Sequence, residues 1–166
     1  MILSQGKWEY FCAKQAELDA AFLENARWNP SIKDRETAFL VELGEFVNEF
    51  VRELRWWKHK WNDRDRMLDE FADTIHFISG ISNTVGDGNP VNSWKVIHSV
   101  YHYRLDFWNV TSIPTLLQDL IRLEDVHEAF ALSLYILKMQ GFKESDLLGA
   151  YNKKNKVNFE RIAAGY

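Results

Sequence analysis

The sequence predicts a single all-α helical bundle, and three observations support this fold class. Apolar residues recur with a helical period along nearly all of the 166 residues, and segments of strict apolar–polar alternation are missing. No Asn-Gly or Asp-Gly pair lies between β-branched runs, as it would in a β-hairpin. The 46% hydrophobic and 27% charged residues are typical of a globular protein, so we expect residues 1–166 to form one domain around one core.

Capping residues and breakers set the boundaries of the first two predicted helices. The first covers residues 4–24 and ends before the breaker Asn29-Pro30. Ser31 and Asp34 have the spacing of a capping box, with Asp in place of the usual Glu or Gln. A second helix therefore begins after Ser31 and is expected to cover residues 32–60.

Four further helices are predicted, over residues 66–84, 92–107, 112–140 and from 143 into the tail. The polar residues 62–65 and the loop 86–90 separate the first two of these from their neighbours. Pro114 suits the first turn of a helix, and Gly141 suits the position just after a helix end. We find no internal repeat and no linker.

Net charge and cysteine content narrow the classes of function. The 20 Lys and Arg against 24 Asp and Glu give a formal charge of −4, so a nucleic-acid partner is not expected. The single Cys12 cannot form an internal disulfide, which suits a reducing compartment. The longest apolar stretch, Ala129–Leu137, is too short to cross a bilayer, and the N-terminus has no signal-peptide pattern. We therefore expect a cytoplasmic protein without a membrane partner.

Acidic residues follow one face of the second predicted helix, beside its apolar stripe. At about 100° per residue, the apolar stripe consists of Leu40, Leu43, Val47, Phe50 and Leu54. The acidic stripe consists of Glu42, Glu45, Glu49 and Glu53. Like charges at these spacings repel by a few tenths of a kcal/mol per pair. Taken alone, this pattern is typical of a solvated acidic face.

The helix predicted over residues 66–84 carries a second pair of carboxylates, Glu70 and Asp73. Its core stripe consists of Leu68, Phe71, Ala72, Ile75 and Ile78. The line through Glu70 and Asp73 continues into Phe77 and Ile81, so this second side of the helix is also expected to be covered. Covered carboxylates need a cation, hydrogen-bond donors or protonation.

Two such pairs on neighbouring antiparallel helices would bring four carboxylates to one point: Glu42, Glu45, Glu70 and Asp73. These hard oxygen ligands suit Mg²⁺ or Mn²⁺ rather than zinc. The sequence therefore predicts a divalent-metal site between the two helices.

One face of the predicted tail helix suits a triphosphate. Lys154, Asn158 and Arg161 follow one another at i, i+4 and i+7, so two cations and an amide share a face. Arg can bond two phosphate oxygens at once, and Lys acts as a mobile point charge. A basic solvated helix has the same pattern, and only the acidic site favours a polyphosphate that bridges the two.

The order Glu-x-x-Glu, about twenty-five residues and then Glu-x-x-Asp resembles the all-α NTP pyrophosphatase (MazG-like) superfamily and implies its helical fold. Within that superfamily, His76 and the tryptophan-rich end of the second helix are similar to the dimeric dUTPases. Residues 151–166 are similar to that family's closing Lys-Asn-x-x-Asn-x-x-Arg…Gly-Tyr motif, although Ile162 stands where relatives often have Gln. Residues 86–149 carry no motif that we recognise.

The resemblance implies a dUTP diphosphatase, which hydrolyses dUTP to dUMP and pyrophosphate by attack of water at the α-phosphorus. Mg²⁺, or Mn²⁺, held by the four carboxylates would polarise phosphate oxygens and activate the water. One of the two glutamates on the second helix, Glu42 or Glu45, is expected to be the general base. Lys154 and Arg161 would offset the charge of the leaving pyrophosphate.

The same resemblance implies a homodimer and nominates residues that bind the nucleotide: Gln15, Trp56 or Trp57, His76 and Tyr166. His76 would pair with the uracil edge, helped by Gln15 and by a tryptophan of the Trp56-Trp57 pair. Lys58 could reach a phosphate, and the family places its final aromatic residue, here Tyr166, near the nucleotide. A buried core histidine and simple tryptophan packing stay open as alternatives.

Three other functions stay open on the sequence. The nearest is a MazG-like pyrophosphatase with another nucleotide substrate. Glu124-x-x-His127 has the Glu-x-x-His spacing of di-iron carboxylate bundles, but a full site needs a second such pair and two further glutamates. A helical interaction module without catalysis would use the many aromatic residues as partner contacts.

Overall fold

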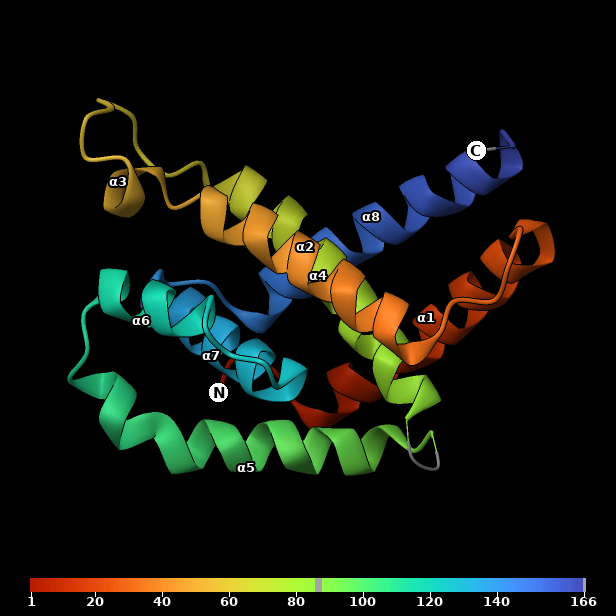
Figure 1. Cartoon of the computed structure of the whole chain (residues 1–166), viewed down its shortest axis with the longest axis horizontal. Coiled ribbons are helices and arrows are strands. Elements are labelled where there is room, and N and C mark those ends of the chain that lie inside the picture. The colour runs from red at the N-terminus through yellow and green to blue at the C-terminus, as the bar shows by residue number, and fades with distance from the viewer. Residues whose placement is uncertain (86–87, 166) are drawn as a thin grey trace.

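The computed structural model describes residues 1–85 and 88–165, without the side chain of Asn25, and over these residues it contains helices and no strand (Figure 1). The helices are α1 (Gln5–Asn25), α2 (Ile32–Asn48), α3 (Val51–Leu54), α4 (Arg64–Thr84), α5 (Pro90–Asn109), α6 (Ile113–Leu120), α7 (Val126–Met139) and α8 (Glu144–Ala163). The predicted all-α fold class is confirmed. In the part of the chain that is described, no helix combines the length and the apolar character needed to cross a membrane.

The second predicted helix is shorter than expected, because α2 ends at Asn48 and not at Lys60. The chain leaves the helical conformation at Phe50 (φ −78°, ψ 60°) before the four-residue α3. A contact distant in sequence stabilises this break: Arg66 Nη2 donates to Glu49 Oε1 over 2.8 Å. The apolar periodicity continues through this break, because Phe50 is fully buried. The local sequence pattern therefore did not predict the end of the helix.

The helix predicted over residues 112–140 is in fact two helices, α6 and α7, separated by residues 121–125. Asp125 caps α7, because its Oδ1 accepts from the backbone N–H groups of His127 and Glu128 over 2.9 and 2.8 Å. Aspartate is among the preferred N-cap residues, so this boundary was readable from the sequence.

The core lies around α4, which packs against α1, α2, α5, α7 and α8. Phe71 of α4 stacks on Phe130 of α7, with 5.7 Å between ring centroids and 1° between the ring planes. Of the predicted core stripe of this helix, Leu68 is half-buried and the others are buried.

The apolar stripe predicted for the helix over residues 32–60 was wrong at two positions, one on α2 and one on α3. Leu40 and Leu54 are exposed, with 44% and 37% of their surface accessible, whereas Phe39 and Phe46 are fully buried. The inward face of α2 is therefore turned towards its phenylalanines, whose rings bury more apolar area than leucine does.

Four of the helices surround the region where the predicted site residues lie. Figure 1 shows α2 and α4 side by side, with the C-terminal parts of α1 and α8 extending towards the same end of the molecule. Both α1 and α8 also pack against α4 and against each other. Side chains from four separate segments of the chain can therefore meet beside α4.

Candidate functional site

Three carboxylates converge between α2 and α4. Oxygen atoms of Glu42 and Glu45 on α2 and of Glu70 on α4 all lie within 4.8 Å of one another. The two glutamates of α2 share a face because they are three residues apart, and Glu70 meets them because α2 and α4 pack along their length. Three hard oxygen ligands at this spacing are suited to one divalent cation.

The electrostatics of this cluster also fit a cation. Burial, followed by the nearby carboxylates of Asp73, Glu45 and Glu70, raises the pKa of Glu42 to about 7. Burial likewise raises the pKa of Glu70, although the charge of Lys154 opposes the rise. Crowded carboxylates that hold protons so readily gain stability when a divalent cation replaces the protons. The residues present therefore fit a bound divalent metal.

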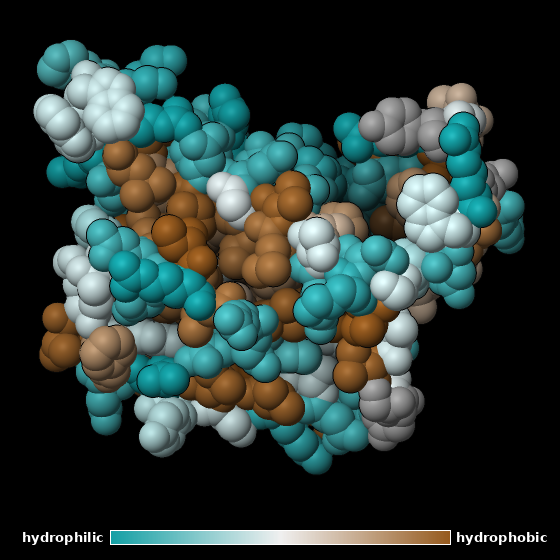
Figure 2. All heavy atoms as spheres, viewed as in Figure 1, coloured by the Kyte–Doolittle hydropathy of each residue, from teal (hydrophilic) through white to brown (hydrophobic). Residues whose placement is uncertain are grey.

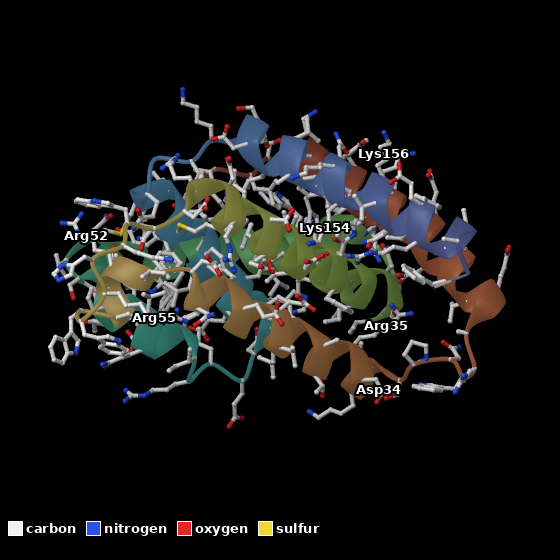
Figure 3. All side chains as sticks on the ribbon, turned by 90° about the horizontal axis from the view of Figure 1, so that it is seen from above. Asp34, Arg35, Arg52, Arg55, Lys154 and Lys156 are labelled. Carbon is white, nitrogen blue, oxygen red and sulfur yellow. The ribbon has the colours of Figure 1, made fainter. Side chains whose placement is uncertain are left out.

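Asp73, the fourth predicted ligand, is placed beside the cluster and held by a lysine. Lys154 Nζ lies 2.7 Å from Asp73 Oδ2 and 2.9 Å from Asp69 Oδ2, so one α8 cation bridges two α4 carboxylates. Hydrogen bonds to both carboxylates raise the pKa of Lys154, against the opposing effect of burial, which is the largest single influence. Figure 3 shows Lys154 between α8 and α4.

A cavity of about 390 Å³ lies next to the cluster, between α1, α2, α4 and α8. It is lined by Gln15, Leu18, Asp19, Phe22, Arg35, Glu42, Asp73, His76, Phe77, Asn158 and Arg161. Six residues predicted from the sequence thus meet there, from four helices. The wall combines carboxylates with an imidazole, amides, a guanidinium and aromatic rings, a mixture of apolar and convergent polar groups that is typical of small-molecule sites.

His76 is buried at the cavity wall and points its two nitrogen atoms to different surroundings. Its Nδ1 lies 2.6 Å from Oε1 of Gln15, and its ring stacks on that of Tyr151 with 4.3 Å between centroids. Its Nε2 has no hydrogen-bond partner among the described residues. Burial, with a smaller contribution from Lys154, lowers the pKa of His76 to about 3, so the ring is neutral at physiological pH.

Asp19 and Arg35 were not anticipated from the sequence and complete the wall beside Gln15. Arg35 Nη1 and Asp19 Oδ2 form an ion pair of 2.7 Å, and Gln15 Nε2 donates to Asp19 Oδ1 over 2.6 Å. The i,i+4 spacing of Gln15 and Asp19 is a sequence signal for this contact. For Arg35, the partner of Asp19 on α2, the sequence contains no comparable spacing signal.

The tryptophan pair and Lys58 do not reach this cavity in the chain described. They lie in the segment after α3, where Trp56 and Trp57 are 85% and 59% exposed and Lys58 is also exposed. Figure 3 shows Arg52 and Arg55, which flank this segment on its N-terminal side, at the opposite end of the molecule from Arg35. Their role in substrate binding stays a prediction. The predicted Tyr166 lies outside the described residues.

The di-iron alternative gains no support from this geometry. Glu124 is exposed in the segment that precedes α7, and over residues 1–85 and 88–165 the acidic cluster of α2 and α4 is the one group of three or more candidate ligands. His127, the other half of that motif, is half-buried near the start of α7.

Comparison with known proteins identifies a family for the chain. A family model described as dUTPase matches residues 7–166, which includes the acidic residues, His76 and the tail. No curated protein matches the chain.

Proposed function

The chain belongs to the dUTPase family and hydrolyses dUTP, and from this premise we propose that the reaction depends on Mg²⁺ and gives dUMP and pyrophosphate. The observation that carries the proposal is the convergence of Glu42, Glu45 and Glu70 beside a cavity that is lined by both Glu42 and His76.

Four carboxylates would hold the metal: Glu42, Glu45, Glu70 and Asp73. A bound Mg²⁺ ion, or Mn²⁺, supplies polarisation of the phosphate oxygens and a more acidic water. Asp73 would join them by exchanging the ammonium group of Lys154, with which it now forms an ion pair of 2.7 Å, for the metal.

Either Glu42 or Glu45 would take the proton of the attacking water. Glu42 lines the cavity as well as the cluster, while Glu45 is the more exposed of the two. A base with a pKa near the working pH is the most effective, which suits a carboxylate surrounded by other carboxylates.

The phosphate chain would lie along α8. Asn158 and Arg161 line the cavity on the same side as Lys154, which is only 14% exposed in its ion pairs. A guanidinium can bond two phosphate oxygens, and the ammonium of Lys154 can exchange a carboxylate for a phosphate at little electrostatic cost. Uracil would then lie towards His76 and Gln15, further into the cavity.

The experiment is an assay of pyrophosphate release from dUTP and from the other common nucleoside triphosphates, with Mg²⁺ and with EDTA. We expect dUTP to be hydrolysed far faster than the others and EDTA to abolish the reaction. Similar rates for several nucleotides would favour the MazG-like alternative. Activity that persists in EDTA would contradict the metal assignment.

Two variants test the ligands. Glu45→Gln and Asp73→Asn should abolish turnover while circular dichroism shows wild-type helix content, because each removes one carboxylate charge without changing side-chain size. Glu36→Gln, which is also on α2 but lies outside the cluster, is the matched control and should retain activity.

We also propose that the enzyme is a homodimer that uses the outer face of α2. Leu40 and Val41 are 44% and 55% exposed, and a side chain at the neighbouring Gly44 would meet nothing within 4 Å. Figure 2, in which α2 faces the viewer, shows hydrophobic residues gathered across this face. Exposed apolar patches of this kind are typical of protein interfaces.

Light scattering coupled to size-exclusion chromatography tests the dimer. The wild-type chain should have twice the mass of 19.6 kDa, and Val41→Lys should shift it towards the monomer. Val96→Lys on α5, where the wild-type residue is 47% exposed, is the matched control and should leave the mass unchanged.

A further inference from the structure

A continuous chain of hydrogen bonds leads from α2 to the imidazole at the cavity wall. Arg35 Nη1 donates to Asp19 Oδ2 over 2.7 Å, Gln15 Nε2 donates to Asp19 Oδ1 over 2.6 Å, and Gln15 Oε1 lies 2.6 Å from His76 Nδ1. The Arg35 and Asp19 side chains are only 13% and 19% exposed. The chain is therefore shielded from water for most of its length.

The donors and acceptors of this chain can be ordered in one way only. A guanidinium donates and never accepts, and an ionised carboxylate accepts and never donates. Asp19 must therefore accept a hydrogen bond from the amide NH₂ group of Gln15. This orientation turns the amide oxygen of Gln15 towards His76. An oxygen at that position requires a proton on Nδ1 of the imidazole.

The other ring nitrogen is then an acceptor. A neutral imidazole carries one proton, so with Nδ1 protonated the Nε2 atom presents a lone pair. Nε2 is buried without a partner among the described residues, and His76, which is 4% exposed, lines the cavity. A buried acceptor left without a donor costs about 1–3 kcal/mol, so a ligand that donates there is favoured.

We infer that Asp19 and Arg35 are positioning residues that fix the tautomer of His76, and that this tautomer selects uracil over cytosine. The inference rests on the proposed function, in which the base lies towards His76. Uracil carries a hydrogen on N3 and can donate to Nε2. Cytosine has a lone pair on N3, which would face the lone pair of Nε2 and repel it.

Gly80 on α4 makes room for the ion pair. A Cβ atom at this position would lie 3.1 Å from both Arg35 Nη1 and Asp19 Oδ2, closer than most such contacts, and 3.6 Å from Gln15 Cγ. The pair therefore lies directly against the α4 backbone, one helical turn after His76. Its position is set by packing on α4 and not only by its charge.

The sharpest test is Asp19→Asn. Because Arg35 can only donate, it keeps its hydrogen bond to the oxygen of the new asparagine amide. The NH₂ group of that amide is then turned towards Gln15. Gln15 must then present its oxygen to this nitrogen and its own NH₂ group to His76, which moves the imidazole proton to Nε2. The ratio of kcat/KM for dUTP over dCTP should fall by roughly ten- to a hundredfold.

A second substitution reverses the effect if the mechanism is correct. Arg35→Met in the Asp19→Asn background removes the donor that holds the amide oxygen, so this oxygen can turn back to Gln15 Nε2. The dUTP over dCTP ratio should return towards the wild-type value. A merely structural role of the ion pair predicts that the double variant is at least as impaired as the single one.

Two controls accompany these variants. Thymine has the same N3–H as uracil, so the ratio for dUTP over dTTP should not change in any of them. Arg104→Met breaks an ion pair of 2.9 Å with Glu128 between α5 and α7, away from the cavity, and should leave all ratios unchanged.

Nitrogen-15 NMR of the histidine side chains measures the tautomer directly, without nucleotide. The wild-type His76 should carry its proton on Nδ1 and the Asp19→Asn variant on Nε2. A wild-type proton on Nε2 would overturn the inference even if no variant folds. An active wild-type enzyme whose base ratio is unaltered by Asp19→Asn would overturn it too, whereas a wild-type protein inactive on every nucleotide would contradict the proposed function instead.

Discussion

At the scale of single residues, Glu42 links the acidity of the solution to metal binding. Its pKa is raised to about 7 by burial and then by the carboxylates of Asp73, Glu45 and Glu70. A carboxylate binds a metal only in its ionised form, so below pH 7 the metal must displace a proton from this side chain. The apparent affinity for a divalent cation should then fall by up to about tenfold per pH unit.

Isothermal titration with Mn²⁺ at pH 8 and pH 6 measures this dependence. We expect markedly weaker binding at pH 6 in the wild type. Glu42→Gln should bind more weakly at both pH values and lose most of the difference between them. Equal wild-type affinities at the two pH values would show that Glu42 is not a ligand.

His76 makes a separate prediction about stability in acid. Its pKa is lowered to about 3 by burial, with a smaller effect of Lys154, whereas an unfolded chain has the ordinary value near 6.5. Above pH 6.5 the ring is neutral in both states, so its protonation does not change the free energy of unfolding. Between pH 6.5 and 3 the unfolded state binds a proton that the folded state does not, so the free energy of unfolding should fall by up to about 1.4 kcal/mol per pH unit.

Urea denaturation between pH 7.5 and 4.5 tests this slope. His76→Gln, which cannot be protonated, should show a shallower loss of stability over the same range. A parallel loss in the variant and the wild type would assign the acid sensitivity to other groups.

Among the helices, α2 has the best-defined beginning. The Ser31 hydroxyl accepts from the Asp34 backbone N–H, and the Asp34 carboxylate accepts from the Ser31 backbone N–H, which confirms the predicted capping box. The cap also precedes Arg35 directly, so it holds the turn of α2 that forms the ion pair with Asp19.

Removing this cap should destabilise the protein by an amount typical of N-caps. Ser31→Ala is expected to lower the free energy of unfolding by about 1 kcal/mol, measured by urea denaturation. Ser4→Ala is the matched control, because the side chain of Ser4 makes no capping hydrogen bond at the start of α1. Equal losses in the two variants would show that the Ser31 cap adds nothing specific.

Helix ends separate what the sequence could predict from what it could not. The start of α2 depends on residues three apart, so a local pattern contains all the information. The end of α2 depends on a distant partner, because Arg66 Nη2 donates to Glu49 Oε1. The short α3 that follows is likewise held by Asn62, whose Oδ1 accepts from the Arg52 backbone N–H and whose Nδ2 donates to Glu53. Such contacts exist only once the chain has folded back, and periodicity through the segment hides them.

The residues of the candidate site also fall into those that the sequence could predict and those that it could not. Spacing within a helix predicts which side chains share a face, and it brought Glu42 and Glu45 together correctly. The pairing of Asp19 with Arg35 depends on how the connection between α1 and α2 sets one helix against the other, which no spacing within either helix contains.

At the scale of the whole molecule, the helix that supplies Gln15 is tied to both of its neighbours in the cavity. Asn83 Nδ2 of α4 donates to the backbone oxygen of Cys12 over 2.7 Å, and Tyr151 of α8 donates to that of Phe11 over 3.3 Å. Cys12 is one turn before Gln15 on α1. Any opening that exposes Cys12 therefore also separates the walls of the cavity.

The reactivity of Cys12 should consequently report nucleotide binding. Burial, and then the charge of Glu9, raises the pKa of this thiol to about 12, and only 1% of the residue is exposed, so alkylation requires the chain to open. A ligand that binds only the closed form stabilises it by about 2.7 kcal/mol at a hundred times its Kd. With dUMP at that concentration and Mg²⁺ present, labelling by iodoacetamide, followed by mass spectrometry, should slow by up to about a hundredfold. A cysteine introduced by Val110→Cys, where the wild-type residue is 85% exposed, should react at the same rate with and without dUMP. If Cys12 also reacted at an unchanged rate, α1 would open without disturbing the bound nucleotide, and the cavity between α1, α4 and α8 would not be where the base lies.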